Sequence, residues 1–97
     1  MKKTLEKIFD WLFIKGRSKK KHDVTIIVKH ELLRSFILDY IDKVEKPKNL
    51  VMYEYEDSVK RTVTVIQGTF STTFCNAFIE QFGHFLKTTL LKFKMDD

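Results

Sequence analysis

The strongest hydrophobic pattern in the chain lies in residues 70–86, where phenylalanine recurs every four residues. At about 100° per residue, the apolar side chains of a helix here would cover an arc of roughly 140°: Phe74, Phe85, Phe78, Phe82, Cys75, Leu86 and Ile79. The pattern predicts an amphipathic helix packed on an apolar surface, with Phe78 and Phe82 deeply buried. Gly83 leaves the end of this helix open, because glycine inside a helix costs about 1 kcal/mol relative to alanine.

A second helical pattern covers residues 31–44. Its apolar side chains follow the i, i+3, i+4, i+7 spacing of one helix face, at Leu33, Phe36, Ile37, Tyr40, Ile41 and Val44. Pro47 stops the helix inside a polar loop. Asp39, Asp42 and Glu45 fall on the outer side, which predicts a solvated face rather than an acid–base pair.

Three segments instead alternate apolar and polar residues, as half-buried strands do: residues 23–30, 50–56 and 59–67. The short connection between the last two predicts an antiparallel hairpin. Residues 90–95 also alternate. That alternation favours a short final strand, and a single helix running on to Lys94 is the alternative.

The predicted order after the N-terminal region is therefore β-α-β-β-α-β. This order is that of a ferredoxin-like, two-layer α+β sandwich with both helices on one face of an antiparallel sheet. We expect Val24, Ile26 and Val28 to fill the layer between sheet and helices. The other face would carry Ile27, Ile66 and either Met52 or the tyrosines. We expect an N-terminal helix to cover part of it, or two sheets to pair in a dimer.

An amphipathic helix is predicted for residues 1–14, with apolar residues at helical spacing and Thr4 as a candidate N-cap. Residues 1–22 hold eight Lys and Arg against two acidic residues, a net charge of +6, whereas the remaining residues sum to −1. The sequence therefore divides into a basic amphipathic arm, residues 1–22, and a single α+β domain, residues 23–97. No run approaches the roughly 18 apolar residues that span a bilayer. Charged residues interrupt the first apolar stretch, so we do not expect a secretory signal.

The arm is the best functional lead. Aromatic and basic residues in this order are typical of a helix that lies on an anionic membrane surface or docks on a protein partner. The candidate contact residues are Phe9, Trp11, Phe13, Lys15, Arg17, Lys19, Lys20 and Lys21. We predict a small non-enzymatic interaction and assembly module, cytoplasmic or peripheral to the membrane, and a homo-oligomer or bound to a partner. A nucleic-acid-binding accessory protein that uses these lysines for phosphate contacts is the alternative. The plain alternative to both is a helix packed on its own domain beside a solvated linker.

The sequence gives weaker evidence for a catalytic, metal or anion site than for the basic arm. His22, His30 and His84 are scattered, and the single cysteine excludes an intramolecular disulfide and a Cys-rich zinc site. Cys75 fits a small core residue better than a ligand. Residues 68–72 could present amides to an anion at a helix N-terminus, although N-capping by Thr69 or Ser71 explains the same residues. We predict no catalytic residue, no metal and no cofactor. RNA recognition on the sheet is disfavoured, because the third strand has no aromatic residue.

Overall fold

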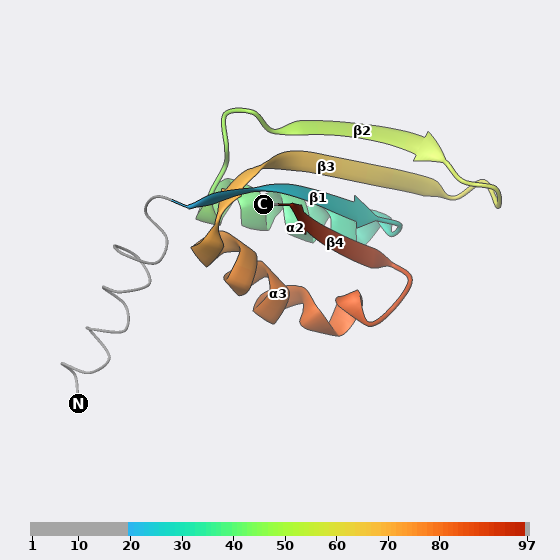
Figure 1. Cartoon of the computed structure of the whole chain (residues 1–97). Coiled ribbons are helices and arrows are strands. Elements are labelled where there is room, and N and C mark those ends of the chain that lie inside the picture. The colour runs from blue at the N-terminus through green and yellow to red at the C-terminus, as the bar shows by residue number, and fades with distance from the viewer. Residues whose placement is uncertain (1–19, 97) are drawn as a thin grey trace.

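The computed structural model describes residues 20–96 and shows one antiparallel sheet covered on one face by two helices (Figure 1). The elements in chain order are β1 (Lys21–Val28), α2 (Glu31–Val44), β2 (Val51–Glu56), β3 (Thr62–Ser71), α3 (Thr72–Leu86) and β4 (Leu91–Asp96). The strand order across the sheet is β2-β3-β1-β4. The predicted two-layer α+β architecture is confirmed. The helix predicted for residues 1–14 lies outside the described residues.

The register between β1 and β3 decides which residues face the helices. Ile26 lies opposite Ile66, and Ile27 lies opposite Val65. Because opposite residues in an antiparallel pair share a face, Ile66 belongs with Val24, Ile26 and Val28 in the core under the helices, where all four are buried. The prediction for Val24, Ile26 and Val28 is confirmed. The placement of Ile66 on the open face was wrong, since its register partner Ile26 is a core residue.

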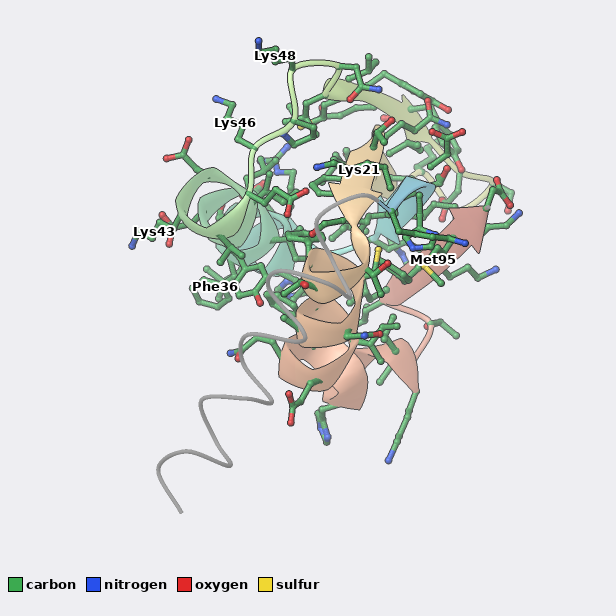
Figure 2. The ribbon with its side chains drawn as sticks, turned by 60° about the vertical axis from the view of Figure 1, so that its left-hand side comes forward. Lys21, Phe36, Lys43, Lys46, Lys48 and Met95 are labelled. Atoms are coloured by element: carbon green, nitrogen blue, oxygen red, sulfur yellow. The ribbon has the colours of Figure 1, made fainter. Side chains whose placement is uncertain are left out.

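Helix α2 begins after His30, whose Nδ1 accepts a hydrogen bond from the Leu33 amide at 3.3 Å. Leu33, Ile37 and Ile41 are buried against the sheet. The predicted apolar face of α2 included Phe36, and this was wrong, because Phe36 is 55% exposed. Figure 2 shows Phe36 projecting from the outer side of α2, away from the sheet.

Helix α3 starts later than predicted, because Phe70 and Ser71 still belong to β3. Ser71 is the N-cap: its hydroxyl accepts a hydrogen bond from the Phe74 amide at 3.1 Å. The helix continues past Gly83 to Leu86. The prediction that Phe78 and Phe82 are buried is confirmed, with exposures of 0% and 7%.

The aromatic side chains form a continuous stack through the core. Phe70 stacks on Phe74 with ring centroids 4.2 Å apart, and Phe78 and Phe82 follow with centroids 4.7 Å apart. Phe93 of β4 stacks on Phe78 at 5.1 Å. Residues 91–96 are a strand, as their alternation predicted, and this strand closes the core on the β1 side.

Candidate functional site

The face of the sheet opposite the helices is built from the alternate residues of all four strands. On β2 these are Val51, Tyr53 and Tyr55, and on β3 they include Val63 and Val65. The β1 and β4 residues on this face include Ile27, Lys92 and Lys94. We call this surface the open face. Neither α2 nor α3 lies on it (Figure 1).

The middle of the open face is apolar and already partly covered. Val63 and Val65 are 0% and 4% exposed, although they lie outside the core beneath the helices. The register places Tyr55 opposite Val63, and Tyr53 opposite Val65. The tyrosines are therefore neighbours of these valines on the open face, as Ile27 is of Val65. Each tyrosine is still 49% exposed.

Strand β2 forms one edge of the sheet and is exposed along its whole length. Val51, Met52, Tyr53 and Tyr55 are each about half exposed, from 47% to 53%. Within residues 20–96, β2 pairs only with β3, so its outer backbone groups have no strand partner there. The opposite edge, β4, alternates charged residues with apolar ones in the sequence LKFKMD. The β2 edge carries two acidic residues, Glu54 and Glu56, and no lysine. The two edges therefore differ in the sign of their charges, and lysine is the charged residue that most discourages further pairing.

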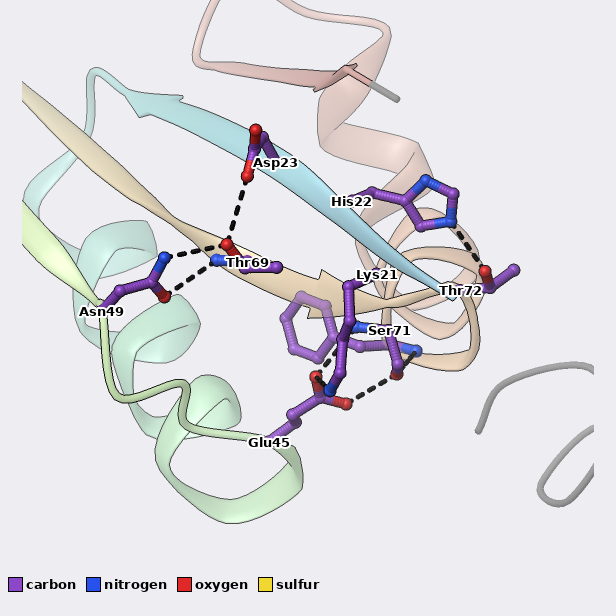
Figure 3. Close-up of polar contacts among 9 residues, drawn as sticks. Lys21, His22, Asp23, Glu45, Asn49, Thr69, Ser71 and Thr72 are labelled. Carbon is purple, nitrogen blue, oxygen red and sulfur yellow. Dashed lines mark hydrogen bonds and ion pairs between the residues drawn. The ribbon is translucent and has the colours of Figure 1, made fainter. Parts of the chain in front are cut away.

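Polar contacts converge where β3 runs into α3 (Figure 3). The Glu45 carboxylate accepts the Ser71 amide at 2.9 Å and the Ser71 hydroxyl at 2.7 Å. Lys21 Nζ lies 3.6 Å from the same carboxylate. The favoured explanation of residues 68–72, N-capping by Ser71, is confirmed, and the Glu45 carboxylate takes the place that a bound anion would occupy at Ser71. Glu45 is also not the solvated residue that its spacing predicted.

A second group of contacts joins the same end of the sheet. The Thr69 amide donates to Asn49 Oδ1 at 3.1 Å, and the Thr69 hydroxyl donates to Asp23 Oδ1 at 3.1 Å. His22 Nε2 is hydrogen-bonded to Thr72 Oγ1 at 2.7 Å. A hydroxyl beside an imidazole is the first part of a nucleophilic site. His22 is only 6% exposed, however, so the contact serves to hold β1 against the start of α3.

A small polar pocket lies at the other end of the sheet, with a volume of about 150 Å³. It is lined by His30, Glu31, Arg34, Glu54, Thr62 and Thr64. Arg34 and Glu54 form an ion pair across it. His30 uses Nδ1 as the cap of α2, so that nitrogen is committed as an acceptor. The pocket is smaller than the 300–1,000 Å³ typical of small-molecule sites.

The structure describes only the end of the predicted contact arm. Phe9, Trp11, Phe13, Lys15, Arg17 and Lys19 lie outside the described residues, and Lys20 is exposed. Lys21 is already the first residue of β1, and its partner is Glu45. The strand therefore begins two residues before the predicted start at residue 23.

Lysines also gather at the end of α2, where Figure 2 shows Lys43, Lys46 and Lys48 projecting outward. Lys43 is paired with Asp39 at 3.1 Å, and Lys46 is paired with Asp42 at 3.6 Å. This group is therefore largely neutralised and offers little net charge to an anionic ligand.

Residues 20–96 hold no group of three or more His, Cys, Asp or Glu side chains placed to bind a metal ion. Neither helix in this part of the chain combines the length and hydrophobicity that crossing a membrane requires. Comparison of the chain with protein-family models, with curated proteins and with solved structures finds no match.

Proposed function

We propose that this protein is a small non-enzymatic interaction and assembly module with a ferredoxin-like domain. The observation that carries the proposal is edge strand β2, which exposes Val51, Met52, Tyr53 and Tyr55 together beside the apolar open face. Surfaces that bind proteins are enriched in tyrosine and methionine relative to the rest of a protein surface. An exposed apolar edge strand is also a ready template for pairing with another chain.

The basic arm supplies the second part of the proposal. Its aromatic residues, Phe9, Trp11 and Phe13, precede a basic run that ends at Lys21. Lys21 is bound by Glu45, so contact with a protein partner or an anionic membrane falls to the basic residues before it. Each such residue contributes about 1 kcal/mol near an anionic surface. The arm would thus place the folded domain at a partner or at the cytoplasmic face of a membrane.

The test compares the full chain with a chain lacking residues 1–19. Sedimentation velocity over a concentration series measures self-association, and flotation measures binding to vesicles with and without phosphatidylserine. We expect self-association in both chains, and binding to anionic vesicles or to a protein partner in the full chain only. A full chain that stays monomeric at several hundred micromolar and binds neither vesicles nor a protein partner would overturn the proposal.

Nucleic-acid binding through the lysines of the basic arm is the second candidate, and one arrangement on the open face would add to it. Lys92 and Lys94 share this face with Tyr53 and Tyr55. Proteins that bind single-stranded nucleic acids combine basic residues that contact the phosphates with aromatic rings that stack on the bases. The two sets occupy opposite edges of the sheet, with aliphatic residues between them. Binding of oligo(dT), measured as salt rises, would support this function if affinity falls steeply and Lys92→Glu weakens it.

A further inference from the structure

We infer that β2 pairs antiparallel with β2 of a second copy of the chain, joining two four-stranded sheets into one. The two-fold axis would pass next to Tyr53. This inference rests on the proposed assembly function and names the partner that the β2 edge accepts. The backbone, the side chains of β2 and the contrast with β4 support it in turn.

The hairpin loop fixes which backbone groups of β2 point outward. The Asp57 amide donates to the Arg61 carbonyl at 3.0 Å, and this pair continues the register of Glu56 opposite Thr62. In an antiparallel ladder, successive residues turn their N–H and C=O groups to opposite sides. The groups of residues 51, 53 and 55 therefore face β3. Those of Met52, Glu54 and Glu56 point away from the sheet and are available to a second strand.

Symmetry limits how two copies can use these groups. A two-fold axis perpendicular to the sheet keeps the helices of both copies on one side, so residues opposite each other must come from the same face. Among the registers that satisfy this condition, two pair the largest part of β2 through its outward groups: one centred on Tyr53 and one centred on Glu54. Each forms about four to six backbone hydrogen bonds between the copies.

Side-chain chemistry decides between the registers. Centring on Glu54 places two Glu54 carboxylates directly opposite each other, which is destabilising. Centring on Tyr53 places Tyr53 opposite its own copy and Val51 opposite Tyr55 on the open face. On the helix side it places Met52 opposite Glu54 of the other copy. The two Glu54 carboxylates are then diagonal neighbours about 7–8 Å apart. The Tyr53-centred register therefore places no like charges directly opposite each other.

The same reasoning disfavours pairing of β2 with β4 of another copy. Glu54 and Glu56 lie on the helix side of the sheet, whereas Lys92 and Lys94 lie on the open face. In a continuous sheet these opposite charges fall on opposite faces and do not meet. Between residues 51 and 56, β2 has no lysine, and its charged residues, Glu54 and Glu56, both lie on the helix side.

The area available sets the strength of the dimer. A fully buried aromatic side chain covers about 150–250 Å², so the exposed halves of four tyrosines supply roughly 400 Å². Val51 and Met52 add to this, but the total stays near or below the 1,200 Å² of a standard stable interface. We therefore expect a dimer in the micromolar range that dissociates on dilution.

The first experiment measures the dimer dissociation constant of the full chain by sedimentation velocity. Tyr53→Lys places two positive charges at the axis and should weaken the dimer at least tenfold. Met95→Lys is the matched control, because Met95 is 44% exposed on the other edge strand. Equal dissociation constants for the two variants would overturn the inference. Circular dichroism confirms that each variant is folded.

Disulfide trapping then tests the register. In the Tyr53-centred register, the two side chains at position 53 form a non-hydrogen-bonded pair with Cβ atoms about 4.5–5.5 Å apart. Tyr53→Cys should therefore cross-link under mild oxidation, while Glu54→Cys and Tyr55→Cys should not. Cross-linking of Glu54→Cys instead would overturn this register. A chain that stays monomeric yet binds vesicles or a partner through its arm would overturn the β2 dimer and leave the proposed function standing.

Discussion

The Glu45 carboxylate binds both the amide and the hydroxyl of Ser71, at 2.9 and 2.7 Å. Glu45 follows the last residue of α2, and Ser71 precedes the first residue of α3. One side chain therefore joins the end of one helix to the start of the next. It also places a negative charge where the dipole of α3 is positive.

Replacing Glu45 should destabilise the fold. Glu45→Ala removes two charge-assisted hydrogen bonds and leaves the amide of Ser71, a residue only 4% exposed, without this acceptor. We expect a loss of about 1–3 kcal/mol in the free energy of unfolding, measured by urea denaturation. Asp42→Ala is the control, because its pair with Lys46 is exposed and should contribute less than about 1 kcal/mol. Equal losses for the two variants would show that the Glu45 contacts do not stabilise the fold.

The two glycines of the domain should respond to alanine with opposite signs. A Cβ at Gly68 would lie 3.0 Å from Pro47 Cγ and 3.2 Å from Phe70 Cε2, so the loop after α2 would have to shift. Gly68→Ala should therefore cost about 1–3 kcal/mol. A Cβ at Gly83 meets no atom within 4 Å, and alanine favours the helix by about 0.5–1 kcal/mol.

Each glycine variant is the control for the other, because replacing glycine by alanine reduces the freedom of the unfolded chain by the same amount at both positions. Thermal melting should show Gly68→Ala below and Gly83→Ala above the parent chain. A stabilising effect at Gly68 would mean that the packing of Pro47 on β3 is loose.

Asp57 should make the stability of the β2–β3 hairpin depend on acidity. Its Oδ1 accepts the amides of Arg61 and Val59 at 2.9 and 3.0 Å. The bond from Arg61 is the main cause of a pKa below the ordinary value of 3.8, because it favours the charged form. The stabilisation is then complete above pH 3.8 and is lost as the pH falls through the lowered pKa.

Asp57→Asn keeps a side-chain oxygen but cannot titrate. We expect this variant to be less stable than the parent chain at pH 7, with the difference shrinking as the pH approaches 2. Urea midpoints at a series of pH values measure it. A difference that stays constant down to pH 2 would contradict the role given to the Asp57 charge.

The helices and strands could be predicted because their apolar residues recur with the period of each structure, about 3.6 residues in a helix and two in a strand. The boundary between β3 and α3 could not, because Phe70 fits both the strand alternation and the aromatic period of the helix. No loop separates the two elements, and Ser71 is at once the last strand residue and the N-cap. Only the pairing of Phe70 with His22 shows that it belongs to the sheet.

The surfaces were harder to predict because they depend on contacts between distant residues. Alternation along β3 already puts Val63 and Ile66 on opposite faces, but only the register with β1 shows that Ile66 is the one that faces the helices. Glu45 shares the spacing of exposed acidic residues, and nothing local indicates that it reaches Ser71, 26 residues away. The exposed tyrosines of β2 were visible in the pattern, but their position at a sheet edge required the strand order.

Phe78 is expected to be the most sensitive core position on α3. It is fully buried and contacts the rings of Phe74, Phe82 and Phe93. Phe78→Ala should lower the free energy of unfolding by about 3–5 kcal/mol. The neighbouring Ile79 is 42% exposed, and Ile79→Ala should cost about 1 kcal/mol or less. Similar melting temperatures for the two variants would contradict the packing of α3.

Tyr40 should make the fold sensitive to alkaline pH. Its ring packs across the helix layer against Phe74, Phe78 and Phe82, with centroids 5.3–6.2 Å apart. Burial, and then the negative charge of Glu80, raise the pKa of Tyr40 above its ordinary value of 10.0. The neutral phenol is favoured in the folded state. Its contribution to stability is therefore present below pH 10.0 and is lost as the pH rises through the raised pKa.

Tyr40→Phe keeps the ring and removes the titrating group. We expect this variant to match the parent chain within about 1 kcal/mol near pH 8 and to lose less stability between pH 9 and pH 11. Glu80→Gln should reduce the alkaline loss by a smaller amount, because burial is the larger cause. Urea midpoints across this range measure both effects. Parallel curves for the parent chain and Tyr40→Phe would show that the phenol of Tyr40 ionises as easily in the folded state as in the unfolded one.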